Sequence, residues 1–61
     1  MERSDILALA EKIRMAAEWN PEDLATLCSA ADMAAEWAAA DGDTFEAVVQ
    51  AAAENLGVEI I

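Results

Sequence analysis

The single proline of this chain constrains its fold more than any other residue. It stands in the stretch Asn20-Pro21-Glu22-Asp23, where each residue suits the start of a helix. Asparagine is a favoured N-cap, proline fits the first helical position, and the two acids stabilise the positive end of the helix dipole. A new helix is therefore predicted to begin at Pro21.

The segment before this boundary has the periodicity of an amphipathic helix. At about 100° per residue, apolar side chains of residues 4–19 gather on one face. This stripe consists of Ile6, Leu9, Ala10, Ile13, Ala16 and Ala17. Ser4 suits the N-cap position. A helix is therefore predicted over residues 4–19, with its stripe facing the core.

The segment after the boundary carries a similar stripe over residues 21–40. The first half of the stripe holds Leu24, Leu27 and Cys28, whereas the second half is all alanine. A break near Asp32 is therefore an alternative to one continuous helix. Such a break would leave a short separate helix over residues 33–39.

A second boundary lies in the stretch Asp41-Gly42-Asp43-Thr44-Phe45-Glu46. Gly42 suits the left-handed turn that ends a helix, and Asp43 with Glu46 has the spacing of a capping box. Apolar residues then recur at helical spacing as far as Leu56. These features predict a helix over residues 43–56 that Gly57 terminates, followed by a short apolar tail.

Together these segments predict an all-α fold in a single helical domain over residues 1–61. It is a small bundle of three short helices, or four if the second one breaks, with a short extended C-terminal tail. The core is small, because 16 of the apolar residues are alanine. Cys28 is the only cysteine and histidine is absent, so neither an internal disulfide nor a zinc site can compensate. We therefore expect a homo-oligomer, with a dimer as the default.

The net charge is −10, and its distribution is uneven. All three cations, Arg3, Lys12 and Arg14, precede residue 15, and ten acids with no base follow them. Such a surface repels nucleic acid and attracts basic proteins, so a basic protein partner is expected and direct nucleic-acid binding is not. No apolar run is long enough for a membrane span, and the N-terminus lacks the pattern of a signal peptide. We expect a cytoplasmic protein with Cys28 as a buried thiol.

The pentapeptide Met-Ala-Ala-Glu-Trp occurs twice, at residues 15–19 and 33–37, and contains both tryptophans. On continuous helices, both copies lie opposite the apolar stripes. Three interpretations are open. A break at Asp32 turns Trp37 into the core while Trp19 covers the end of the first helix; the repeats form an oligomer interface; or the two tryptophans line a groove for a ligand. The candidate interface or ligand residues are Lys12, Arg14, Met15, Glu18, Trp19, Met33, Glu36 and Trp37.

Catalytic residues are not expected. Histidine and tyrosine are absent, the hydroxyl groups have no neighbouring base, and Cys28 lies on an apolar stripe where a thiol is inert. The acids of Asp41, Asp43 and Glu46 lack the spacing of a calcium-binding loop. Two glycines cannot form a phosphate-binding loop. We therefore expect no enzymatic activity, no metal and no cofactor.

Small size, acidity, abundant alanine and the absence of catalytic residues make the chain resemble the small accessory proteins of bacteriophages and mobile elements. The resemblance implies a non-catalytic protein that binds stoichiometrically through an oligomeric helical surface. Such a protein would inhibit or regulate a host component, for example one of host defence. The alternative is a sponge for a nucleotide-type signalling ligand, held in a Trp-lined pocket between protomers, with Arg14 or Arg3 reaching a phosphate.

Overall fold

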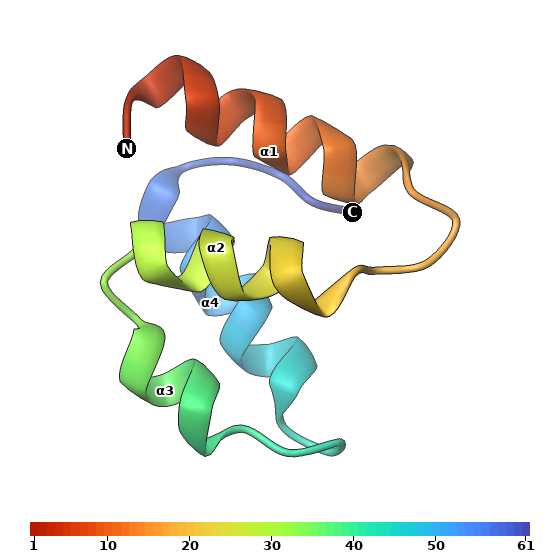
Figure 1. Ribbon diagram of the computed structural model, residues 1–61, viewed down its shortest axis with the longest axis vertical. Coiled ribbons are helices and arrows are strands. Elements are labelled where there is room, and N and C mark those ends of the chain that lie inside the picture. Colours follow the sequence, from red (N-terminus) through yellow and green to blue (C-terminus); the bar gives the residue numbers. More distant parts are fainter.

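The computed structural model describes all residues 1–61 and contains four helices and no strand (Figure 1). The helices are α1 (Arg3–Met15), α2 (Pro21–Ala30), α3 (Ala34–Ala39) and α4 (Phe45–Leu56). The predicted all-α class is confirmed. The C-terminal residues 58–61 run as extended chain beneath α1, toward its C-terminal end (Figure 1). None of the four helices combines the length and the apolar character that crossing a membrane requires.

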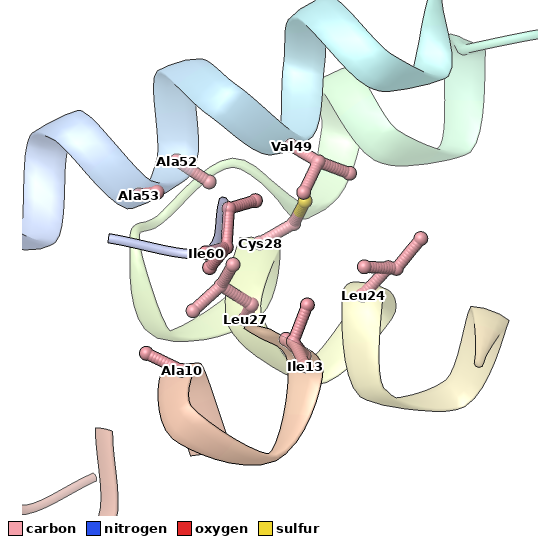
Figure 2. Packing of buried hydrophobic residues seen from close by; sticks show 9 residues of the cluster. All are labelled: Ala10, Ile13, Leu24, Leu27, Cys28, Val49, Ala52, Ala53 and Ile60. Carbon is pink, nitrogen blue, oxygen red and sulfur yellow. The ribbon is translucent and has the colours of Figure 1, made fainter. Parts of the chain in front are cut away.

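Helix α2 lies at the centre of the molecule, where it contacts α1, α3 and α4. The core consists of nine buried residues: Ala10, Ile13, Leu24, Leu27, Cys28, Val49, Ala52, Ala53 and Ile60. Figure 2 shows Ile60 of the C-terminal tail among side chains of α1, α2 and α4. Helix α3 contributes no buried residue, so it is a peripheral element that packs on the outside of α2 and α4.

Helix α1 differs from its prediction at both ends. It begins at Arg3 after Glu2, so Ser4 lies inside the helix and is not its N-cap. It ends at Met15 rather than Trp19, because Ala16 is already extended. Asn20 is also extended, as the residue before a proline must be. Continuing the helix past Met15 would bury only alanine methyl groups, whereas unwinding it lets Trp19 reach the core.

The break near Asp32 is present and has a defined geometry. Asp32 adopts a left-handed conformation with φ of 60°, the only non-glycine residue to do so. Its N–H donates to the carbonyl of Ser29 at 3.1 Å, and the N–H of Met33 donates to the carbonyl of Cys28 at 2.7 Å. These two bonds form a Schellman motif, which satisfies carbonyls at the end of α2 and turns the chain away from the helix axis.

The start of α4 corrects the predicted cap. Asp43 and Glu46 do not form a capping box; Asp41 and Thr44 form a reciprocal pair instead. The carboxylate of Asp41 accepts from the N–H of Thr44, and the Thr44 hydroxyl accepts from the N–H of Asp41 at 3.0 Å. Gly42 does not have the left-handed conformation expected of it, since the only glycine with positive φ is Gly57. The helical segment itself begins at Phe45, not at residue 43.

The end of α4 follows the prediction. Gly57 has φ of 69°, and Val58 donates its N–H to the carbonyl of Ala53 at 3.0 Å. This is a second Schellman motif, now with glycine at the left-handed position. The guanidinium of Arg3 donates to the carbonyls of Leu56 and Gly57, so the first turn of α1 supplies positive charge to the negative end of α4.

Candidate functional site

A surface pocket of 560 Å³ opens between the linker before α2, helix α3 and the start of α4. It is lined by Trp19, Pro21, Leu24, Trp37, Ala40, Asp41, Gly42 and Phe45. This volume lies within the range of about 300–1,000 Å³ that ligand pockets occupy. The lining includes every aromatic residue of the chain, since the sequence holds two tryptophans, one phenylalanine and no tyrosine.

Trp19 and Phe45 form two walls of the pocket that stand nearly at right angles. Their ring centroids are 6.4 Å apart and their planes meet at 85°, which is an edge-to-face pair. Both side chains are half-buried and pack against the core. Trp19 reaches this position because α1 unwinds after Met15.

Trp37 enters the same pocket from α3. The turn at Asp32 precedes it. In the first turn of the helix, the backbone N–H of Trp37 donates a hydrogen bond to the carbonyl of Met33 at 3.0 Å. Its side chain is half-buried against the core, like that of Trp19. The two copies of the repeated pentapeptide therefore send their tryptophans to one place.

Asp41 is the only charged residue in the pocket lining. Its Oδ1 accepts hydrogen bonds from the N–H of Asp43 at 2.9 Å, the N–H of Thr44 at 3.1 Å and the Thr44 hydroxyl at 3.2 Å. The bonds from the Asp43 N–H and from Thr44 hold the pKa of the Asp41 carboxyl below its usual range. All three bonds end on Oδ1, so Oδ2 accepts no hydrogen bond from the protein.

Of the eight residues that the sequence predicts as interface or ligand candidates, only Trp19 and Trp37 line this pocket. Met15 lies outside it and is 74% exposed. Met33 is half-buried and its sulfur accepts a hydrogen bond from the Asn55 side chain at 3.2 Å. The carboxylates of Glu18 and Glu36 are exposed, each one residue before a tryptophan.

The cations among those candidates lie elsewhere. Lys12 pairs with Asp23 through an Nζ–Oδ1 distance of 3.3 Å. Arg14 borders a separate hollow between α1 and the C-terminal tail, together with Val58 and Glu59. The pocket therefore contains no positive charge from its own chain.

Two important pocket residues are not among the predicted candidates. The sequence pattern places Asp41 and Phe45 only at the boundary before the last helix. The available signal was the scarcity of aromatic residues. The chain has only three, and the third is Phe45, the first residue of α4. Its distance in space from the tryptophans is set by the folding of α4 onto α2.

The only thiol of the chain takes no part in this pocket. Cys28 is fully buried in the core, and burial, together with the nearby negative charge of Glu36, raises the pKa of its thiol. No three side chains of the metal-binding types lie close enough together to hold a metal ion. The pocket thus offers aromatic faces, a small apolar wall and one carboxylate.

No family model matches the chain, and neither a curated protein nor a solved structure shows significant similarity to it. The function is therefore to be inferred from the geometry of the pocket and the charge around it.

Proposed function

We propose that the chain is a non-catalytic binding protein that inhibits or regulates a basic protein partner stoichiometrically. Its contact site is the pocket lined by Trp19, Trp37, Phe45 and Asp41, which we call the aromatic pocket. The observation that carries this proposal is the placement of the largest apolar side chains. All three rings are kept half-buried at the surface, while the largest fully buried side chains are Ile13, Leu27, Cys28 and Val49.

This placement leaves part of each ring available for binding, while the rest of the ring packs on the core. A small domain has little apolar area to bury, and aromatic side chains supply the most per residue. Each ring here keeps part of its surface open at the pocket, so a partner that covers the rings would bury further apolar area. Tryptophan is also enriched among the residues that dominate binding energy at protein interfaces.

The lining of the aromatic pocket supports a non-catalytic role. Asp41 is the only ionisable side chain of the lining, and the Thr44 hydroxyl that bonds to it also accepts from the Asp41 N–H, which ties this hydroxyl to the turn before α4. Proton transfer and covalent catalysis both need a nucleophile or a second acid–base group. Burial of Cys28 keeps the remaining candidate nucleophile away from solvent.

The charge of the chain supports a basic partner. Ten of the acids follow residue 14, and Glu18, Glu36 and Asp43 stand next to or near lining residues in the sequence. Fields of this kind steer partners of opposite charge and raise association rates. From the resemblance to small phage and mobile-element proteins, we propose a component of host defence as such a partner. The two proteins would then meet in the cytoplasm.

Oligomerisation remains a prediction separate from the aromatic pocket. The pocket is formed within one chain, so it needs no second copy. The large apolar side chains that stay exposed are Met1, Leu7, Met15 and Ile61. A homodimer would draw its apolar contacts from these residues or from the exposed parts of the tryptophans.

Nucleotide sequestration is supported less well. A phosphate needs a cation or a row of N–H groups, and the pocket lining presents the Asp41 carboxylate instead. Arg3 is engaged with the carbonyls at the end of α4, and Lys12 is paired with Asp23. The observations therefore favour a partner that is positively charged.

A peptide-display selection tests the proposed function. Wild type is the bait, and each selected peptide is then measured against Trp37→Ala and against Met15→Ala. Met15 belongs to the same repeated pentapeptide but is exposed outside the pocket, which makes it the matched control. We expect basic peptides whose affinity falls at least about tenfold with Trp37→Ala and stays unchanged with Met15→Ala. Selected peptides that bind Trp37→Ala as tightly as wild type, or no enrichment above background, would overturn the proposal.

A further inference from the structure

We propose that the aromatic pocket receives an arginine side chain of the basic partner, whose guanidinium stacks on the tryptophan rings and pairs with Asp41. This inference rests on the proposed function and specifies the group that occupies the site. It joins three observations: the arrangement of the rings, the single carboxylate among them, and the absence of any lysine or arginine of the chain from the pocket lining.

The rings provide faces on which a cation can lie. In the edge-to-face pair of Trp19 and Phe45, the edge of one ring meets a face of the other, and both rings remain partly exposed at the pocket. Both rings and Trp37 border the pocket. Cations are attracted to the face of an aromatic ring, most strongly to that of tryptophan, and arginine is the protein side chain that uses this interaction most often.

The carboxylate provides the opposite charge at the same site. The bonds to Oδ1 of Asp41 fix the side chain and leave Oδ2 without a donor from the protein. A guanidinium presents several N–H donors in one plane and can bond to a carboxylate while it stacks on a ring. An aromatic pocket with one fixed carboxylate therefore matches both properties of the arginine side chain.

An uncharged occupant fits the pocket less well. A leucine or phenylalanine of a partner would cover Asp41 and remove water from its carboxylate. Such a side chain provides neither a hydrogen-bond donor nor a positive charge to replace that water. A lysine ammonium is more strongly hydrated and lacks a flat surface for stacking. The net charge of −10 further favours a cation over a neutral group at long range.

The test compares two ligands of the same shape and different charge: N-acetyl-arginine amide and N-acetyl-citrulline amide. Citrulline replaces the guanidinium by a neutral urea group. Each ligand is titrated into the wild-type protein at low salt, and the indole N–H signals of Trp19 and Trp37 are followed by NMR. We expect both signals to shift with arginine, and the arginine ligand to bind at least about fivefold more tightly than the citrulline ligand.

A pair of variants shows whether the charge acts inside the pocket. Asp41→Asn removes the carboxylate charge but keeps an oxygen that can cap the helix. Asp43→Asn removes an equal charge two residues away, outside the pocket lining. We expect Asp41→Asn to abolish the preference for arginine over citrulline and Asp43→Asn to leave that preference almost intact.

Three results would overturn the inference. The first is equal binding of arginine and citrulline, which would show an apolar site and leave the proposed function standing. The second is an equal loss of preference in the two variants, which would show a long-range field only. The third is the absence of any indole shift with arginine in wild type; the peptide selection then decides separately whether the pocket binds a partner at all.

Discussion

The two copies of Met-Ala-Ala-Glu-Trp have the same sequence and different conformations. In the first copy, Met15 is the last residue of α1, Ala16 is extended and Trp19 lies in the linker. In the second copy, Met33 is the N-cap and Trp37 lies within α3. Both tryptophans nevertheless line the aromatic pocket.

The two copies differ in their flanking residues and in the contacts that their tryptophans make. The first copy is followed by Asn20 and Pro21, and the residue before a proline is held extended. The second copy is preceded by Asp32, whose left-handed conformation ends α2 and allows a new helix to begin. Helix propensity alone therefore does not fix the conformation of these five residues; the flanks and the contact of Trp19 with Phe45 decide it.

The largest effect is expected at the first copy. Trp19→Ala removes the ring that packs on Phe45 and on the core, and the linker around it has no other large apolar side chain. We expect the free energy of unfolding to fall by about 2–3 kcal/mol, less than for a fully buried tryptophan. Urea unfolding followed by far-UV circular dichroism measures this change. A loss below about 1 kcal/mol would mean that the pair with Phe45 does not hold the linker in place.

The second copy should respond locally. Helix α3 has six residues and none of them is buried, so Trp37 provides most of its attachment. A helix this short is unstable alone. Trp37→Ala is therefore expected to expose the amides of α3 to hydrogen exchange while those of α2 and α4 stay protected. Equal deprotection of all helices would show that α3 is part of the same cooperative unit as the core.

A smaller, stabilising effect is expected at the turn before the second copy. Asp32 has φ of 60°, and glycine adopts this conformation without strain. Asp32→Gly also removes a negative charge from the negative end of the α2 dipole. We expect a gain of about 0.5–1 kcal/mol in the free energy of unfolding. Asp32→Asn removes the charge alone and separates the two contributions. A destabilised glycine variant would show that the aspartate side chain itself contributes to the turn.

The smallest effect concerns the caps that follow the two copies. Asn20 Oδ1 accepts from the N–H of Glu22 at 2.9 Å and does not titrate, whereas Asp41 does. Because folding lowers the Asp41 pKa, its contribution to stability is complete above the unfolded pKa of about 3.9 and is lost as the pH falls through the folded pKa. Wild type should therefore lose more stability between pH 5 and acid conditions than Asp41→Asn does. Thermal unfolding of both proteins across this range measures the difference; parallel curves would contradict it.

The helix starts and ends that could be predicted were those with a local chemical cause. Pro21 with its asparagine cap, and Gly57 with its positive φ, act through their own backbone and immediate neighbours. The end of α1 has no such local signal, because Ala16, Ala17 and Glu18 all favour a helix. The chain unwinds there in favour of a contact with Phe45, which lies far along the sequence.

The candidate site, like the helix ends, could be predicted only in part. The repeated pentapeptide singled out Trp19 and Trp37, and one of the three open interpretations placed them together in a groove. Phe45 and Asp41 could not be predicted as pocket residues. In the sequence, Phe45 looks like part of an apolar helix stripe, and Asp41 looks like part of a turn. Lys12, another predicted candidate, would share a helix face with Trp19 only if the helix continued through Trp19, but α1 ends at Met15.

The helical, strongly acidic character of this protein and its scarcity of large apolar side chains follow directly from its residues, since propensity, charge and composition are properties of single residues. The tertiary structure alone decided that the three rings share one pocket and that its only charge is negative. The physical reason is the range of the interactions. Caps and turns act over a few residues, whereas the burial that draws Trp19, Trp37 and Phe45 together exists only after α2, α3 and α4 have packed.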